Sequence, residues 1–508
     1  MIADWETPAI SVAVVDGDNV YAKGFGTARL DQMTPATEKT LYMCGSTSKA
    51  FTAMIMAQLV ADDDNYPQVQ WRSKVRDLIP EDFALQDEYA SNHVTIEDAM
   101  SHRTGLPAHD LAYGSNDQDQ RATVQEMVQS IQYLPMVDEL RQDYQYNNLM
   151  FMVMQHTIEV VTNTSLKQLV EERIFKPLGF EDSLYSPDEE TMLANPNFAK
   201  GYAHVPPPNG ESINGTGDYA EVPVQYLPTI AGAGGVVSSV ADYTRWARAI
   251  LNRSSVLLPS SDSFDQFWIP RSYVEQDSIY TSPVTYGLAW QIGDYQGHLV
   301  HSHSGGMNAY GAYLYIFPDD DYAVIGLGNT ALSSNYAELP LLFELIDDRF
   351  DIPQEQRYNF QQADVEEVKE EEEPYPFTEA MEDYYNITSN SQRSPLPLPL
   401  EKYSGHYYDP GYKNLNIHVS MIDIDADGNS TPPTAVLQAT RDSSSWTQTL
   451  TWWHVSDNYF LCYSTSPTDT YSPSVSPCEF KVEADGQEVQ AVGIQWSDLE
   501  QLIWLNRK

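Results

Sequence analysis

Strand-like segments lie at both ends of the first 330 residues, and helical patterns fill residues 85–255 between them. Strands are predicted at 10–15, 19–26, 299–303, 310–317 and 322–327. Polar turns join the first two strands and the last two, as in β-hairpins. A sheet assembled from both ends of a sequence around a helical insertion predicts an α+β fold, with an antiparallel sheet flanked by helices.

The composition changes after residue 351. Residues 352–396 are rich in acidic residues and proline, including the acidic run 366–373, and predict a linker that is partly helical and partly extended. Short alternating segments rich in aromatic residues then predict a small all-β barrel over 397–508. We therefore predict an α+β domain over 1–351, a linker and a β domain, which 508 residues, 42% of them hydrophobic, can fill with packed cores.

The net charge is −45, from 28 basic and 73 acidic residues. Nucleic acid and anionic membrane surfaces would be repelled by such a chain, so neither is an expected partner. No stretch reaches the apolar length of a membrane-spanning helix, and no signal peptide opens the sequence. The sequence as written predicts a cytoplasmic protein, or a secreted one if a further segment precedes it.

Three cysteines are too few for a disulfide scaffold. Cys44 is predicted to be a buried free thiol. Cys462 and Cys478 flank a Ser/Thr/Pro-rich loop between two strand-like segments, where they can form a bridge in an oxidising compartment.

Ser46-Thr47-Ser48-Lys49 stands where a glycine precedes an apolar run that predicts a buried helix. Residues three apart share one face of a helix, so the Lys49 amine can lie beside the Ser46 hydroxyl. A serine becomes nucleophilic when a base takes its proton, and a desolvated lysine can be that base. The N–H groups at the helix start suit an oxyanion. The pattern is short, and about one chance match is expected in a sequence of this length.

Tyr146 and Asn148 lie just before the apolar stretch 149–154 and can both face a cleft. A phenol near Lys49 can carry protons, and an amide can hold a substrate carbonyl or orient the lysine. The alternative is an aromatic-rich helix entry without a chemical role.

His303-Ser304-Gly305-Gly306 ends a predicted strand, where glycines let a ligand approach the backbone. The Gly306 N–H can pair with that of Ser46 as an oxyanion hole. His303 can donate to a substrate carboxylate or assist proton transfer. The alternative is a strand-ending turn with an incidental histidine. A further polar segment, 101–107, is interpreted as a structural helix end.

The order of these motifs resembles that of the serine beta-lactamase and penicillin-binding superfamily. More narrowly, the sequence is similar to the beta-lactamase-related serine hydrolases, which include class C beta-lactamases, D-alanyl-D-alanine carboxypeptidases, D-aminopeptidases and esterases. The resemblance covers roughly residues 8–345. Residues 400–407 resemble the start of the lipocalin-like C-terminal domain of some of these hydrolases. The flanking segments that agree are 45–52, 78–80, 101–107, 231–236 and 286–290.

The resemblance implies that Ser46 is the acylated nucleophile, Lys49 its base or proton relay, and Tyr146 the second base, which activates the incoming water or amine. The implied substrate-binding and oxyanion residues are Asn148, His303, Gly305 and Gly306. No metal ion or cofactor is implied. The expected substrate is a small molecule or short peptide with an amide or ester bond, such as a peptide containing a D-residue.

Three departures from the family pattern refine this expectation. His303 stands where most beta-lactamases have the lysine of Lys-Thr-Gly. In relatives a histidine here accompanies peptidases and esterases more often than antibiotic resistance, so a peptidase or esterase is expected rather than a true beta-lactamase. Residues 307–311 lack the Pro-Gly-Phe-like turn of many relatives, and the helix that usually precedes the first strand is nearly absent, which concerns stability rather than chemistry.

Two other functions remain open. An acyltransferase on the same scaffold would use the same acyl-enzyme, with an alcohol or amine in place of water. A non-catalytic binding or regulatory protein could retain the pocket, although a decayed site usually loses one of its four polar motif residues, and all four are present here. No pattern in the sequence indicates an oligomeric state.

Overall fold

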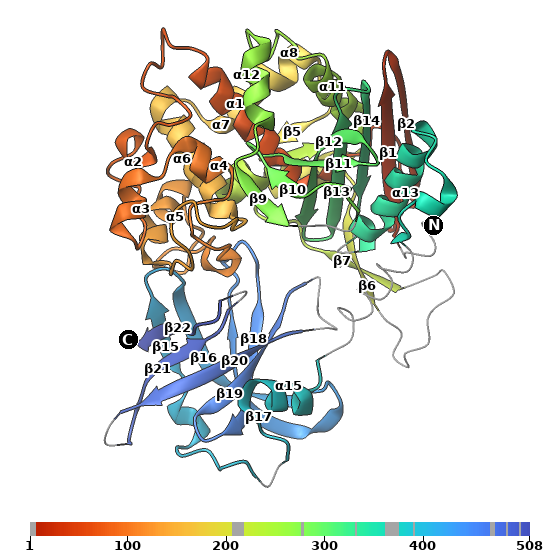
Figure 1. The fold of residues 1–508 in the computed structure, drawn as a ribbon. Coiled ribbons are helices and arrows are strands. Elements are labelled where there is room, and N and C mark those ends of the chain that lie inside the picture. The colour runs from red at the N-terminus through yellow and green to blue at the C-terminus, as the bar shows by residue number, and fades with distance from the viewer. Residues whose placement is uncertain are drawn as a thin grey trace. The chain divides into compact units, whose positions relative to one another are not determined.

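The structure is a computed structural model that divides into two compact units, each with its own sheet (Figure 1). The first unit comprises Met1–Ala108 and Pro135–Val365, and the second comprises His109–Leu134 and Glu366–Lys508. The residues described are 7–205, 218–275, 279–330, 333–360, 375–389, 392–467, 473–483, 486–496 and 499–508. The predicted acidic run 366–373 lies outside them.

A nine-stranded antiparallel sheet lies at the centre of the first unit. Its order is β3-β2-β1-β14-β13-β12-β11-β10-β9, so strands from both ends of the unit meet at the β1–β14 pair. This arrangement confirms the predicted α+β class. Its strands are β1 (Ala9–Asp16), β2 (Asn19–Arg29), β3 (Thr34–Pro35), β9 (Ser272–Glu275), β10 (Val284–Tyr286), β11 (Gln291–Tyr295), β12 (His298–Met307), β13 (Tyr310–Phe317) and β14 (Tyr322–Gly328). Smaller sheets contain β4 (Tyr42–Met43), β5 (Leu184–Tyr185), β6 (Gly201–Val205), β7 (Asp218–Val222) and β8 (Val236–Ser238).

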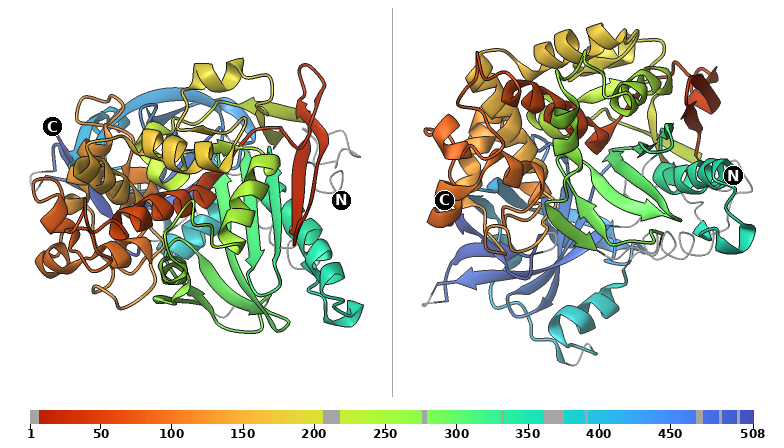
Figure 2. Two further views of the ribbon diagram at one scale, coloured as in Figure 1. Left: turned by 90° about the horizontal axis from the view of Figure 1, so that it is seen from above. Right: turned by 45° about the horizontal axis from the view of Figure 1, so that its top comes forward.

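Helices cover both faces of this sheet, which explains why β13 and β14 are buried along almost their whole length. Helix α13 packs on β13 and β14, and α11 packs on β1 and β14 from the other side (Figure 2). The α-helices of the unit are α1 (Lys49–Val60), α2 (Val75–Leu78), α3 (Glu88–His93), α4 (Ile96–Met100), α6 (Asn148–Thr162), α7 (Leu166–Val170), α8 (Lys176–Leu178), α9 (Glu189–Ala194), α10 (Ala231–Gly234), α11 (Val240–Leu251), α12 (Ser261–Asp265) and α13 (Ser333–Arg349). The other helical segments are the π-helix η4 (Glu171–Phe175) and the 3-10 turns η1 (Gly45–Ser48), η5 (Pro228–Ile230), η6 (Gln266–Trp268) and η7 (Gln354–Gln356).

The second unit contains a closed eight-stranded antiparallel barrel, as the sequence predicted. Aromatic rings fill its interior: the Phe460 and Phe480 ring centroids lie 5.1 Å apart, and Tyr403 lies 5.2 Å from Phe480. The eight barrel strands are β15 (Gly405–Asp409), β16 (Lys413–Ile424), β17 (Ser430–Thr440), β18 (Thr449–Ser456), β19 (Tyr459–Thr465), β20 (Ser474–Val482), β21 (Val489–Ile494) and β22 (Ile503–Arg507). The helical segments α15 (Phe377–Tyr385) and η9 (Leu400–Lys402) precede them in this part of the chain.

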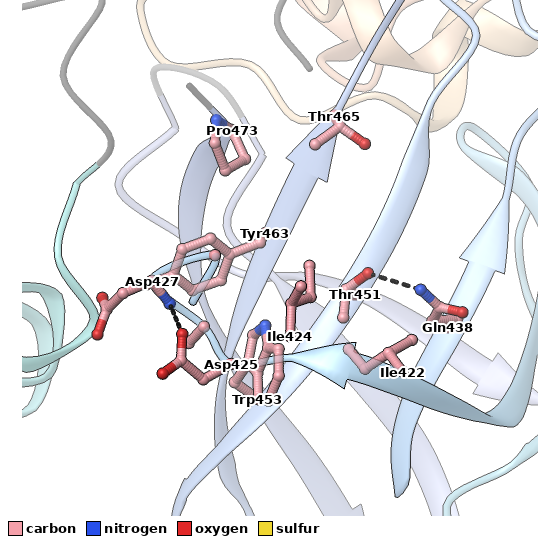
Figure 3. Close-up of a pocket in the computed structure, with 12 residues that line it drawn as sticks. Ile422, Ile424, Asp425, Asp427, Gln438, Thr451, Trp453, Tyr463, Thr465 and Pro473 are labelled. Carbon is pink, nitrogen blue, oxygen red and sulfur yellow. Dashed lines mark hydrogen bonds between the residues drawn. The ribbon is translucent and has the colours of Figure 1, made fainter. Parts of the chain in front are cut away.

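A pocket of about 340 Å³ lies on the barrel face that α15 packs against (Figure 3). Trp453 and Tyr463 line it together with the side chains of β16, and Gln438 donates a hydrogen bond to Thr451 at its edge, 3.1 Å away. This concave surface is therefore on the outside of the strands, whereas the barrel interior is filled by its own side chains.

Residues His109–Leu134 belong to the barrel unit, although the sequence placed them within the helical insertion of the first domain. The buried Arg441 guanidinium donates to the Leu111 carbonyl at 2.6 Å and lies over the Trp496 ring. The Tyr113 carbonyl accepts hydrogen bonds from the Ser444 hydroxyl and the Ser445 N–H. This segment contains η2 (Asp110–Ala112), α5 (Val124–Ser130) and η3 (Ile131–Tyr133). The predicted linker 352–396 and domain boundary at 397 stay predictions.

Glu338 on α13 is a buried carboxyl with no hydrogen-bond partner among the described residues. Burial raises the pKa of this carboxyl well above its usual value of 4.5. Between pH 4.5 and the raised pKa, this carboxyl loses its proton in the unfolded chain but keeps it in the folded protein. The free energy of unfolding therefore falls by about 1.4 kcal/mol per pH unit until the folded pKa is reached.

We expect Glu338→Gln to stabilise the fold at neutral pH, because glutamine has no proton to lose. Thermal unfolding midpoints should agree near pH 4.5 and diverge as the pH rises to 8, with the variant the more stable. Glu344→Gln is the matched control, since the Glu344 side chain on the same helix is 58% exposed. A difference between Glu338→Gln and the wild type that does not widen with pH would contradict a buried neutral carboxyl.

Candidate active site

Ser46 lies in the 3-10 turn η1, which leads directly into α1. The sequence predicted a continuous helix, but the Thr47 hydroxyl donates to the Cys44 carbonyl at 2.8 Å at the start of this tighter turn. Side chains three apart eclipse in a 3-10 turn, so the expected pairing of Ser46 with Lys49 is kept. Gly45 has a φ of 51°, a conformation that favours glycine.

Asn147 holds the second predicted motif in place by capping α6. Its side-chain oxygen accepts the Met150 N–H at 2.8 Å, and its amide donates to the Leu106 carbonyl at 3.0 Å. Tyr146 is thereby fixed immediately before the helix, and Asn148 occupies its first position. The segment is therefore a helix entry, and it also brings the Tyr146 hydroxyl to Ser46 and the Asn148 amide oxygen to Lys49.

Two predicted side chains contact the Ser46 hydroxyl, and a third contacts the amine of Lys49. Ser46 Oγ lies 2.8 Å from Lys49 Nζ and 2.7 Å from the Tyr146 hydroxyl. The amine also lies 2.6 Å from Asn148 Oδ1 and 4.8 Å from the centre of the Tyr146 ring. Lys49 is fully buried, and Ser46 is partly exposed. A hydroxyl held between an amine and a phenol can lose its proton to one of them as its oxygen attacks a substrate carbonyl.

The end of β12 lies against this turn. β11 pairs with β12 only as far as Ser302, and η1 packs beside the residues that follow. A Cβ on Gly305 would lie 2.2 Å from the Cys44 carbonyl oxygen, and one on Gly45 would lie 2.7 Å from the Gly306 nitrogen. The glycines therefore allow a backbone approach that no other residue would permit.

Exposure alternates along the end of β12, with His303 and Gly305 buried and Ser304 and Gly306 exposed. The open side of the strand is thus formed by Ser304 and Gly306. Ser304 is not among the residues predicted from sequence, and the two-residue period of the strand is the signal that points to it.

His303 lies beside Tyr146 rather than on this open side. Its Nε2 is 2.7 Å from the Tyr286 hydroxyl, its Nδ1 is 2.6 Å from the Ser304 carbonyl, and its ring centroid is 6.3 Å from that of Tyr146. Burial, with the nearby Lys49 charge, lowers the pKa of His303 to about 3. The imidazole is therefore neutral at physiological pH and carries no positive charge for a substrate carboxylate.

His102, which the sequence analysis treated as structural, supports the ring of Tyr146. The ring centroids lie 4.5 Å apart, and His102 Nδ1 accepts the Asn147 N–H at 3.0 Å. Nδ1 is thus an acceptor, so the proton of the neutral ring is on Nε2. Burial lowers the pKa of His102 well below its usual value. The residue also has a φ of 57°, an uncommon conformation for a side chain other than glycine.

We expect His102→Leu to lower kcat by about 10- to 100-fold with little change in KM. The Tyr146 ring would lose the imidazole that it packs against, and the Asn147 N–H would lose its hydrogen-bond acceptor. His102→Asn should recover part of the loss, since its amide oxygen can accept the Asn147 N–H. Because His102 stays neutral, the pH profile of kcat should keep its shape. A shifted profile would show instead that His102 titrates in the reaction.

All three cysteines are free thiols, and burial raises the pKa of Cys44 to about 12. Cys462 and Cys478 lie on the neighbouring strands β19 and β20. Over the described ranges no three His, Cys, Asp or Glu side chains gather as a metal site, and no helix is long and apolar enough to cross a membrane.

A family model described as "Beta-lactamase" matches residues 2–343, about two thirds of the sequence. The chain belongs to the beta-lactamase family. A relative from Aspergillus campestris (strain IBT 28561), named unguisins hydrolase ungD', is 35% identical over 99% of this chain and 89% of its own length. The family and this relative's name identify a hydrolase and confirm the resemblance seen in the motifs.

Two solved structures share the fold at low sequence identity. The octameric penicillin-binding protein homologue from Pyrococcus abyssi has a TM-score of 0.55 and 18% identity, covering 99% of this chain and 97% of that one. A D-stereospecific amidohydrolase from Streptomyces sp. has a TM-score of 0.50 and 19% identity, covering 64% and 90%. The fold is therefore that of penicillin-binding proteins and beta-lactamases.

Proposed function

We propose that this protein cleaves an amide or ester bond through an acyl-enzyme on Ser46, and that the bond belongs to a short peptide containing a D-residue or to a small ester. One observation carries the proposal: Ser46 Oγ lies within hydrogen-bond distance of both Lys49 Nζ and the Tyr146 hydroxyl. A serine between two groups that exchange protons is what an acyl-transfer site requires.

In the proposed first step, Lys49 takes the Ser46 proton as Oγ attacks the substrate carbonyl carbon. Tyr146 supplies a proton to the departing nitrogen or oxygen and is reprotonated from Lys49. In the second step Tyr146 passes its own proton to the neutral Lys49 and takes one from water, whose oxygen attacks the acyl carbon. The protonated Lys49 then returns a proton to Ser46 Oγ as the acyl group leaves. The Ser46 and Gly306 N–H groups would receive the negative oxygen, which is supported by the closeness of Gly45 to the Gly306 nitrogen.

The neutral His303 favours a scissile bond that is remote from a free C-terminal carboxylate. A lysine at this place would supply a positive charge, whereas this imidazole is buried between Tyr286 and the strand backbone. The D-residue is favoured by the fold that this chain shares with a D-stereospecific amidohydrolase, and the peptide class by the relative named as a hydrolase of unguisins.

Matched peptides test this proposal. Each pair should carry a D- or an L-residue before one internal amide bond, with the C-terminus either free or amidated, and cleavage should be followed by mass spectrometry. We expect the D-peptide to be cleaved at least about tenfold faster, and the amidated form at least as fast as the free acid. Cleavage only of C-terminal residues next to a free carboxylate, or only of beta-lactams, would contradict it. Ser46→Ala is the inactive control, and an added amine in the assay distinguishes acyl transfer from hydrolysis.

A further inference from the structure

Three arginines surround one glutamate in a cavity of about 470 Å³ in the first unit. Arg271 Nε lies 3.1 Å from Glu97 Oε2, whereas the nearest nitrogens of Arg72 and Arg103 lie 3.5 and 3.6 Å from Glu97 Oε1. The last two distances are ion-pair contacts longer than ordinary hydrogen bonds. Trp71 and Gln266 line the same cavity.

The three guanidinium groups carry three positive charges, and Glu97 neutralises one of them, so two positive charges remain in excess. Arg103 also contacts Asp98 at 2.7 Å, but Arg141 pairs with that carboxylate as well, so including both leaves the excess at two. Burial lowers the pKa of Arg271; the contact with Glu97 opposes this shift, and the charges of Arg103 and Arg72 add to it. Such a concentration of positive charge is notable in a chain whose net charge is −45.

Part of this cluster has a structural role. Arg271 donates to the carbonyls of Gln266 and Ile269, and Arg103 donates to the Arg271 carbonyl at 3.1 Å. The first two bonds stabilise the 266–271 segment internally, and the third joins it to Arg103, just after α4. Arg72 makes none of these backbone hydrogen bonds. Its side chain is 89% exposed and contributes the third positive charge.

We propose that this cavity binds a small dianion that carries a phosphate or sulfate group. The excess of two charges matches a dianion, and guanidinium groups bind such oxyanions through paired, charge-assisted hydrogen bonds. Arg72 and Arg103 would provide these bonds, while Arg271 and Glu97 hold the wall of the cavity. The site is separate from Ser46 and from the proposed hydrolysis.

Titration calorimetry and thermal unfolding of the full chain test this site, with sodium phosphate, sulfate and a simple phosphate monoester compared with chloride at equal ionic strength. We expect saturable binding of phosphate and sulfate and a raised unfolding midpoint. Arg72→Ala should weaken binding at least about tenfold. Lys74→Ala is the matched control, since it removes an equal charge two residues away that does not line the cavity, and should leave binding unchanged.

Tighter binding of the monoester than of inorganic phosphate would identify an organic phosphate as the ligand, and the reverse order a free ion. No saturable binding, or equal weakening by the two variants, would overturn the proposal. Ester hydrolysis by Arg72→Ala should match the wild type, so that a failure of this site is distinguishable from a failure of the Ser46 mechanism.

Discussion

Replacing Lys49 with methionine is expected to slow acylation of Ser46 by about 10³-fold, measured as the initial burst with a nitrophenyl ester. Methionine keeps the unbranched apolar stem in its buried site but removes the nitrogen 2.8 Å from Ser46 Oγ. The proton of the serine then has no amine to receive it. Because Lys49 Nζ lies over the rings of Phe151 and Tyr146, the end of the methionine can pack against the same rings, and the unfolding midpoint should change little.

Lys39→Met is the matched control for this variant. Lys39 is half exposed, and its amine pairs with Glu181 at 3.0 Å rather than with a group at Ser46. Its replacement should leave the burst rate unchanged. A Lys49→Met enzyme with a normal burst would show that another group takes the Ser46 proton.

Adding one methyl group at Gly305 is expected to have the second-largest effect, a fall in kcat/KM of about 100-fold. The new Cβ in Gly305→Ala would lie 2.2 Å from the Cys44 carbonyl oxygen, so β12 and the Ser46 turn must separate. Separation moves the Gly306 N–H away from the Ser46 N–H, and the proposed oxyanion hole loses one donor. We also expect a stability loss of about 1–3 kcal/mol from overpacking.

Gly306→Ala provides the stability control for this prediction. A Cβ at Gly306 meets no atom of the described residues within 4 Å, so its unfolding midpoint should equal that of the wild type. A Gly305→Ala protein with wild-type activity and stability would contradict the close approach of strand and turn.

The pairing of Ser46 with Lys49 and that of Tyr146 with Asn148 could be anticipated from their short spacings. The meeting of the two pairs, about 100 residues apart in sequence, was implied by the resemblance of the motif order. The three-residue spacing of the first pair places both side chains on one face, and the helix cap at Asn147 places the second pair at one end of α6. The two strand groups likewise predicted a sheet assembled from both ends, which the β1–β14 pair confirms.

Other features depend on contacts between distant residues and leave no local pattern. His102 resembled an ordinary helix end, and only the fold brings its ring to Tyr146 and Tyr286. The substrate-facing place predicted for His303 followed from its motif, whereas its burial depends on Tyr286, 17 residues away in sequence.

The grouping of residues 109–134 with the barrel was equally inaccessible. It depends on Arg441 and on Ser444, more than 300 residues further along the chain, which bind the backbone of Leu111 and Tyr113. No periodicity or turn signal in either segment carries that information.

Covalent labelling tests the central claim most directly. The protein should be treated with a fluorophosphonate, digested, and the adduct located by peptide mass spectrometry. We expect one adduct per chain, on Ser46, and neither labelling nor ester turnover in Ser46→Ala. An adduct on a different serine, or unchanged turnover by Ser46→Ala, would contradict the account of Ser46 as the acylated nucleophile.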